Sequence, residues 1–300
     1  MASGFPHLDG IYGPLEIGQV VGAFLFGIQT LQCLHYFREF PKDSARLKAI
    51  VALVWFLELG EKISGLHQLY SITITFYGEP PSQILAKPPH SSELQDIFSV
   101  LSLTVVQLFF GNRVRILSGN WIIMFLSLVL SLFTLIVALI SVAQVWTSTS
   151  AITTLEVKLR WVNIAAMSAT PILDILIASF LCFYLWKFRK SEFRSKTHRM
   201  LDTLTLWTIE TTFLTSICAI MQVILFLVNA DLSRVAFQSI QSKLFASSML
   251  AVLNGRTRFR SNDDVAPAIP DDLAFNLSER RNDEETNNPT FLHSHRDVVE

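Results

Sequence analysis

The sequence predicts an all-α, polytopic membrane protein: a bundle of seven transmembrane helices followed by a disordered C-terminal tail. Two properties indicate this fold class. Hydrophobic residues make up 51% of the chain and charged residues only 16%, whereas a soluble domain carries about 25% charged residues. In addition, seven mostly apolar stretches meet or approach the roughly 20 residues that a helix needs to cross a bilayer.

The seven stretches follow one another with short polar connections. The first covers residues 14–37, and Pro14 suits the first helical turn because an N–H is not needed there. No Lys or Arg precedes this stretch, so we expect it to stay as a membrane span and not to be removed as a signal peptide. The others cover residues 47–70 (with an extension through 71–76), 94–117, 121–146, 160–186, 201–228 and 235–254. The fourth stretch fits a membrane span best, because it contains no ionisable residue. The second and seventh fit it least well, because each carries charges.

The basic residues predict the orientation of the spans. Fifteen Lys or Arg follow the odd-numbered stretches, whereas four lie on the opposite side of the membrane. Because cytoplasmic loops are enriched in Lys and Arg, we expect the N-terminus outside and the C-terminus in the cytosol, with the plasma membrane as the location. The domains are then a short extracellular segment (1–13), the transmembrane domain (14–255) and a cytoplasmic tail (256–300).

The tail differs from the rest of the chain in charge. From residue 261 to residue 300 it has ten Asp or Glu and three Arg, with few aromatic residues. This composition predicts a disordered acidic segment. The tail also holds the one permitted N-glycosylation sequon, Asn276-Leu277-Ser278, which we expect to remain unmodified because a cytosolic tail does not meet the glycosylation machinery.

Six ionisable side chains fall at membrane depth, where charges are costly and face the bundle interior or a wet cavity. They are Glu58, Glu61, Lys62, Asp174, Glu210 and Lys243. The three on the second span are separated by three and four residues, so they share one helix face. Four acids against two bases leave two negative charges uncompensated, unless some carboxyls are protonated or a cation is bound. This imbalance favours proton or cation coupling.

A structural interpretation of the same residues stays open. Glu58 precedes Lys62 by four residues, the favourable order for an ion pair within a helix. Lys243 on the seventh span and Asp174 on the fifth could form a second pair. Both pairs would then hold helices in register without any part in transport.

A basic segment lies between the fifth and sixth spans, on the expected cytosolic side. It consists of Lys187, Arg189, Lys190, Arg194, Lys196 and Arg199. Clusters of this kind gain about 1 kcal/mol per charge near an anionic membrane surface. The segment is therefore a candidate surface for a cytosolic partner or for anionic lipid.

Several pieces of the sequence resemble an uncharacterised fungal membrane family, domain of unknown function 6534. These pieces are Gly13-Pro14-Leu15, Val106-Gln107-Leu108-Phe109-Phe110 before Arg113, Leu173-Asp174-Ile175-Leu176-Ile177, Leu214-Thr215-Ser216-Ile217, Lys243-Leu244-Phe245-Ala246-Ser247-Ser248 and Leu253-Asn254-Gly255-Arg256. The resemblance covers about residues 13 to 256. It implies a seven-helix membrane protein of mushroom-forming fungi and implies no activity.

Three classes of function are consistent with the sequence. Seven spans with basic inner loops and a flexible tail favour a receptor or sensor, although the Asp-Arg-Tyr, Asn-Pro-x-x-Tyr and outer cysteine pair of animal receptors do not occur. The alternatives are a proton- or cation-coupled transporter or channel that uses the buried carboxylates, and a structural or lipid-organising protein. No HExxH, GxSxG or CxxC motif occurs, so we expect no enzyme activity, no metal site and no cofactor. The expected partners are the lipid bilayer and either a small-molecule ligand or a cation, and not nucleic acid.

Overall fold

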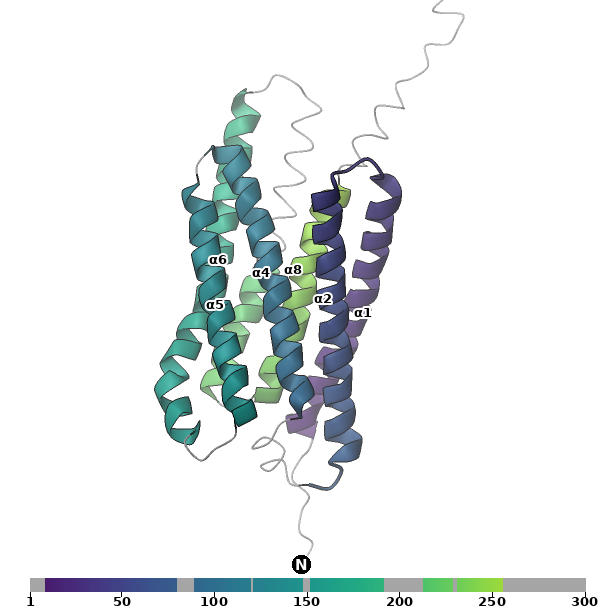
Figure 1. Ribbon diagram of the computed structural model, residues 1–300, viewed down its shortest axis with the longest axis vertical. Coiled ribbons are helices and arrows are strands. Elements are labelled where there is room, and N and C mark those ends of the chain that lie inside the picture. Colours follow the sequence, from purple (N-terminus) through teal and green to yellow (C-terminus); the bar gives the residue numbers. More distant parts are fainter. Residues whose placement is uncertain are drawn as a thin grey trace, which may run out of the picture. The chain divides into compact units, whose positions relative to one another are not determined.

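The computed structural model describes residues 9–79, 89–119, 121–147, 152–191, 213–228 and 231–255 (Figure 1). The chain divides into two units, residues 1–256 and 257–300, and all the described residues lie in the first. Within these ranges the regular structure is helical and no strand occurs. The tail from residue 256 onward lies outside the described residues, so its predicted disorder stays a prediction.

Seven helical segments make up the described ranges, which confirms the predicted fold class. Six are α1 (Asp9–Glu39), α2 (Ala45–Tyr70), α4 (His90–Ser118), α5 (Ile122–Thr147), α6 (Ile152–Ser191) and α8 (Asp231–Asn254). The remaining one, Phe213–Leu227, precedes α8. A short π-helical segment, η1 (Ser71–Thr75), continues α2, as the extension of the second span predicted.

Five of the helices begin earlier than the sequence pattern predicts, and α1 and α6 differ most. α1 starts at Asp9, so Pro14 lies inside the helix and not in its first turn. The acceptor that an N–H at position 14 would use is the carbonyl of Gly10, in the first turn of the helix, so the proline removes only one bond near the helix end. α6 starts at Ile152, eight residues before the expected span, because polar residues of a connecting segment can continue a helix beyond its apolar part.

Contacts between residues of neighbouring helices show how the helices run relative to one another. Along α1 and α8, Gly18 faces Ala236 and Gly22 faces Ser239, so these two helices run parallel. Figure 1 shows α4 between α5 and α6 on one side and α1, α2 and α8 on the other.

α4 pairs with its sequence neighbours in the opposite sense. It runs antiparallel to α2, because Gln95 bonds Glu61 whereas Ser102, further along α4, bonds the earlier residue Glu58. Because α1 and α8 run parallel, the first residue of α1 and the last residue of α8 lie at opposite ends of the bundle.

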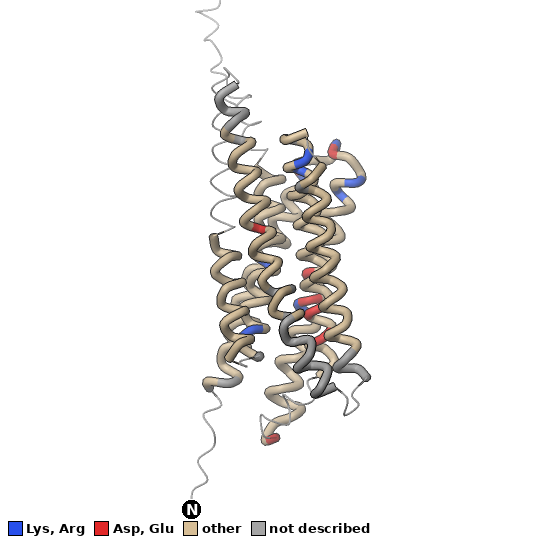
Figure 2. The backbone as a smooth tube through the Cα atoms, turned by 90° about the vertical axis from the view of Figure 1, so that its left-hand side faces the viewer, with Lys and Arg blue, Asp and Glu red and all other residues tan. Residues whose placement is uncertain are grey.

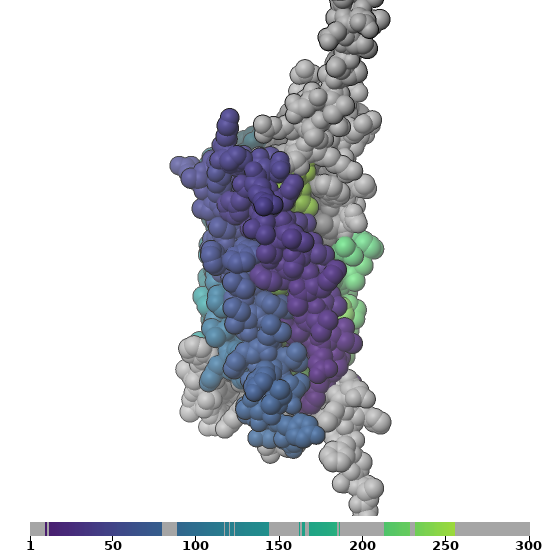
Figure 3. Space-filling view, turned by 90° about the vertical axis from the view of Figure 1, so that its right-hand side faces the viewer, coloured from purple at the N-terminus to yellow at the C-terminus, as the bar shows by residue number. Residues whose placement is uncertain are grey.

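Burial in this bundle is inverted relative to a soluble protein. On α1, Phe24 is 70% exposed whereas Gln29 is fully buried. The same pattern holds on α5, where Phe125 is 67% exposed and Ser131 is fully buried. Figure 3 views the face on which α1 and α2 lie side by side. Soluble monomers rarely expose apolar surface on this scale, so these outer faces suit a lipid environment.

Three of the described helices are long and apolar enough to cross a membrane: Tyr12–Glu39, His90–Ile116 and Met124–Ala143. Two shorter apolar helices, Ser168–Tyr184 and Phe213–Leu227, accompany them. α2 and α8 are long enough but less apolar, because their buried faces carry charged and hydroxyl side chains. Their apolar faces are therefore narrower.

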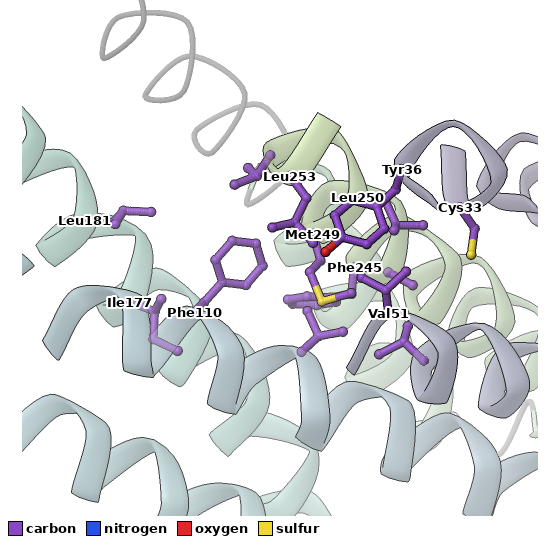
Figure 4. Packing of buried hydrophobic residues seen from close by; sticks show 14 of the residues in the cluster. Cys33, Tyr36, Val51, Phe110, Ile177, Leu181, Phe245, Met249, Leu250 and Leu253 are labelled. Atoms are coloured by element: carbon purple, nitrogen blue, oxygen red, sulfur yellow. The ribbon is translucent and has the colours of Figure 1, made fainter. Parts of the chain in front are cut away.

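The apolar core is split into two clusters. The larger joins the later halves of α1, α4 and α8 to the first half of α2 and the middle of α6, and Figure 4 shows Phe110, Phe245, Met249 and Leu250 from it. The smaller contains Leu15, Ile72, Leu232 and Val235. Along α1, α2 and α8 a polar layer lies between the two clusters.

A close helix crossing gives the first prediction. A Cβ atom on Gly18 would lie 2.7 Å from the Cα of Ala236 on α8, and backbone cannot move aside as a flexible side chain can. We expect Gly18→Ala to destabilise the protein by about 1–3 kcal/mol, as overpacking does, and to lower its unfolding temperature in detergent micelles.

Gly27→Ala is the matched control, because nothing lies within 4 Å of a Cβ at that position. Alanine there should be neutral or stabilise by roughly 0.5–1 kcal/mol through its higher helix propensity. Equal effects of the two substitutions on the unfolding temperature would contradict the close crossing of α1 and α8.

Candidate functional site

The centre of the polar layer is a lysine shared by two carboxylates. Lys243 of α8 lies with its Nζ 2.6 Å from Oε2 of Glu58 and also pairs with the carboxylate of Glu61. The two glutamates stand three residues apart on α2, so both face α8. All three side chains are at most 1% exposed. The ring of Phe26 on α1 lies 5.8 Å from the same Nζ.

Neutral donors complete the coordination of the two carboxylates. Ser102 of α4 and Ser242 of α8 both donate to Oε1 of Glu58, the latter at 2.6 Å. Gln95 of α4 donates to Oε1 of Glu61 at 3.3 Å. Buried charges are tolerated when such hydrogen bonds satisfy their remaining lone pairs. We call Glu58, Glu61, Lys62, Lys243 and these donors the polar cluster.

Lys62 belongs to the polar cluster but bonds a different helix. Its Nζ donates to the backbone oxygen of Gln19 at 3.2 Å and to Oε1 of Gln19 at 2.9 Å. A Cβ on Gly22 would lie 2.8 Å from this Nζ, so the glycine leaves room for the lysine. Similarly, a Cβ on Gly65 would lie 2.6 Å from Oε1 of Gln19. Small residues on α1 and α2 therefore make space for the polar side chains.

These contacts correct both expected ion pairs. Lys62 bonds the Gln19 oxygens and not Glu58, because its position on the helix turns its amine toward α1. Lys243 pairs with Glu58 and Glu61 and not with Asp174, because α2 and not α6 faces this side of α8. The polar cluster holds two lysines and two glutamates, so its formal charge is balanced.

Asp174 forms a second, separate polar centre. Its Oδ1 accepts a hydrogen bond from Nε2 of Gln107 on α4 at 3.1 Å, and Oε1 of Gln107 accepts one from Ser131 of α5 at 2.9 Å. Asp174 is 5% exposed, and its Oδ2 has no hydrogen-bond partner. Of the candidate side chains that the structure describes, Asp174 is thus the carboxyl group that no lysine or arginine pairs with.

The remaining candidates fall at the edge of the described residues or beyond it. Glu210 lies outside them, as do Arg194, Lys196 and Arg199. Lys187, Arg189 and Lys190 lie in the last turns of α6. Figure 2 shows several charged positions together at one end of the bundle and others at intervals along the helices.

Sequence reasoning missed the amide and hydroxyl members of these centres. Gln19, Gln95 and Gln107 are buried, and each donates one hydrogen bond from its side-chain amide. A further interaction joins Gln238 of α8 to Asp96 of α4 at 3.0 Å and to Arg234 at 3.0 Å. The available signal was helical spacing, because Gln95, Ser99 and Ser102 recur on one face of α4 within an apolar run.

The described part of the chain contains no group of three or more His, Cys, Asp or Glu side chains that could hold a metal ion. Nitrogen- and sulfur-based centres such as structural zinc sites need such groups. The chemistry of both polar centres is instead that of oxygen acceptors and ammonium or amide donors.

Comparison with known proteins gives one match. A family model described as "Family of unknown function (DUF6534)" matches residues 170–258. The matched region runs from the middle of α6 to just beyond α8, so it contains Asp174 and Lys243 but neither Glu58 nor Glu61. No curated protein and no solved structure matches the chain. The DUF6534 match covers under a third of the chain. Over that part it supports a relation to a family of unknown function.

The shared lysine gives the second prediction. Lys243→Met would leave two buried carboxylates without their cation, and removing one partner of a buried pair costs about 3–5 kcal/mol. We expect a correspondingly lower unfolding temperature for the purified protein. The charge-balanced double variant Lys243→Met/Glu61→Gln, which removes one charge of each sign, should recover most of the loss.

Lys42→Met is the control, since Lys42 is an exposed residue of the α1–α2 connection and surface substitutions usually change stability by less than about 0.5 kcal/mol. A Lys243→Met protein as stable as Lys42→Met would show that the pairing does not hold α2 to α8.

Proposed function

We propose that this chain is an integral multi-pass membrane protein with a receptor- or sensor-like role, in which the polar cluster responds to a small polar ligand. The observation that carries the proposal is the isolation of the polar cluster. The larger apolar cluster, with Tyr36, Val54 and Phe245, adjoins it on one side. No hydrogen bond among the described residues connects it to Asp174. A site closed on one side suits ligand sensing better than passage through the bundle.

The composition of the polar cluster supports a ligand that carries charge or several hydrogen-bonding groups. Lys243 is held by two carboxylates, and either carboxylate alone would neutralise it. A ligand amine that takes Glu61, or a ligand carboxylate that takes Lys243, would therefore change a contact that joins α2 to α8. Such an exchange alters helix packing without moving an ion across the membrane.

We further propose the orientation in which the N-terminus lies outside and the C-terminus in the cytosol, at the plasma membrane. The alternating helices support it, because they bring the last turns of α1, α4 and α8 to one end of the bundle, and in the sequence basic residues lie in or follow each of these turns. At that end Arg115 lies over the ring of Trp121, 4.3 Å from its centroid, as an interfacial anchor would. The basic segment 187–199 would then face a cytosolic partner or anionic lipid. We also extend the family resemblance to residues 13–256 and to a fungal seven-helix family.

Glycosylation mapping tests this orientation. An N-terminal extension that carries an acceptor sequon should be glycosylated during synthesis into microsomes, and Asn276 should not, as judged by a gel shift that a glycosidase removes. Modification of Asn276 alone would reverse the assigned orientation.

An ion-coupled transporter is the second candidate, favoured by the partnerless oxygen of Asp174. Proton and cation flux into liposomes that hold the purified protein separates the two functions. We expect no flux above empty liposomes across a range of pH, because the polar centres form no continuous path in the described residues. Flux that both Asp174→Asn and Glu210→Gln abolish would overturn the receptor-like role and establish a transporter or channel.

A structural or lipid-organising protein is the third function consistent with the fold. A ligand that binds the native state at 100 times its Kd raises stability by about 2.7 kcal/mol. Small polar compounds that raise the unfolding temperature of the wild type, but not of the charge-balanced double variant, would support the sensor over this alternative.

A further inference from the structure

The short connection between α1 and α2 is held in place by contacts at both of its ends. Tyr36, a fully buried residue of the larger apolar cluster, donates from its hydroxyl to Oδ2 of Asp43 at 3.0 Å. The Nζ of Lys48 donates to the carbonyl oxygen of Pro41 at 2.5 Å. One contact ties the connection to α1 and the other ties it to α2, so the side chains that leave it start from a defined backbone.

Three basic side chains extend from this connection and its helix ends. Arg38 lies in the last turn of α1, Lys42 in the connection and Arg46 in the first turn of α2, and all three are exposed. Within the described residues no carboxylate forms an ion pair with any of them. Asp43 is bonded to the buried tyrosine hydroxyl, and the first turn of α2 has no acidic residue. The exposed acid nearby is Glu39, so positive charge predominates on this surface.

Exposed apolar side chains precede and follow these charges along the two helices. Leu34 and Phe37 of α1 are 56% and 39% exposed, and Leu53 of α2 is 47% exposed. They belong to the outer faces that suit a lipid environment. The basic side chains therefore lie where the apolar outer surface ends. Lys and Arg can lay their apolar stems along such a surface while the charged groups reach the headgroup region.

An exposed tryptophan marks the same level of the bundle. α2 and α4 run antiparallel, with Glu58 bonded to Ser102. Arg115 lies thirteen residues after Ser102 and Ala45 lies thirteen residues before Glu58, so equal helical rise places these two positions level with each other. Arg115 lies over the ring of Trp121, which is 65% exposed. Tryptophan is enriched at the membrane–water interface, so the start of α2 lies at the depth of the lipid headgroups.

We propose that Arg38, Lys42 and Arg46 bind the headgroup of an anionic phospholipid, whose acyl chains lie along the exposed apolar residues of α1 and α2. Basic residues close to a membrane end attract anionic lipid. Their position beside lipid-facing apolar side chains favours a lipid over a soluble anion. The surface is separate from the polar cluster and from the basic segment 187–199, and it does not depend on the proposed sensor role.

Native mass spectrometry of the full-length protein tests this surface, with phosphatidylserine and phosphatidylcholine added in separate titrations. We expect phosphatidylserine to bind at least roughly tenfold more tightly. The preference should decrease as ammonium acetate is raised, because salt screens exposed charges. The variant Arg38→Gln/Lys42→Gln/Arg46→Gln should lose it, since each removed charge weakens binding about fivefold.

The matched control is Arg280→Gln/Arg281→Gln/Arg296→Gln, which removes the same charge from the tail and should keep the preference for phosphatidylserine. A variant that gains affinity separates lost binding from misfolding. Glu39→Gln removes the exposed acid beside the site, so it should tighten phosphatidylserine binding about fivefold.

Three results would overturn the proposal. The first is equal affinity of the wild type for the two lipids. The second is an equal loss of preference in both triple variants, because the protein would then respond to net charge alone. The third is displacement of phosphatidylserine by an equal concentration of inorganic phosphate, which would assign the surface to a soluble anion. None of these results bears on ligand binding at the polar cluster, so this proposal and the sensor role can fail separately.

Discussion

The ion pairing of Lys243 with Glu58 and Glu61 is the constraint on which the arrangement of α1, α2, α4 and α8 depends. A lysine in the middle of an apolar helix bundle is stable only where carboxylates face it, which fixes the rotation of α2 and its height relative to α8. Through Ser102 and Gln95 the same carboxylates bond α4. Gln95 then accepts from Gln19 at 3.5 Å, which brings α1 into the same network. Four helices are thus placed by one set of polar contacts.

The outer surface and the interior follow from this arrangement. Because the polar side chains are gathered inside the bundle, the outer faces of α1 and α5 can consist of large apolar residues. Lipid offers helices no hydrophobic drive to associate, so close packing and interhelical hydrogen bonds must supply the attraction. Glycines at the crossings serve both purposes. Gly18 lets α1 approach the backbone of α8, and Gly65 opens the space that the Gln19 amide occupies.

The helices could be predicted from the sequence far better than the contacts of the site. Apolar runs of about 20 residues are a property of each segment, so the seven helices and the extension of α2 through residues 71–75 agree with the structure. Pairing depends on which helix faces which. The spacing of four residues predicted an ion pair between Glu58 and Lys62. In the structure Lys62 instead donates to two oxygens of Gln19 on the neighbouring helix α1. Gln95 and Ser102 carry no charge, so only their spacing along one face of α4 distinguishes them from other polar residues in apolar runs.

α4 separates the two polar centres. Ser102 bonds Glu58 and Gln107 bonds Asp174, and a spacing of five residues turns these side chains roughly 140° apart around the helix. Val106 lies between them in the sequence and packs in the larger apolar cluster. A polar path from one centre to the other would have to cross this packed layer. Energetic coupling between them is therefore better carried by α4 moving as a rigid element whose position both centres bias. A ligand that loosens the contacts of Glu58 would then act on the same helix that holds Gln107 against Asp174, from a different face.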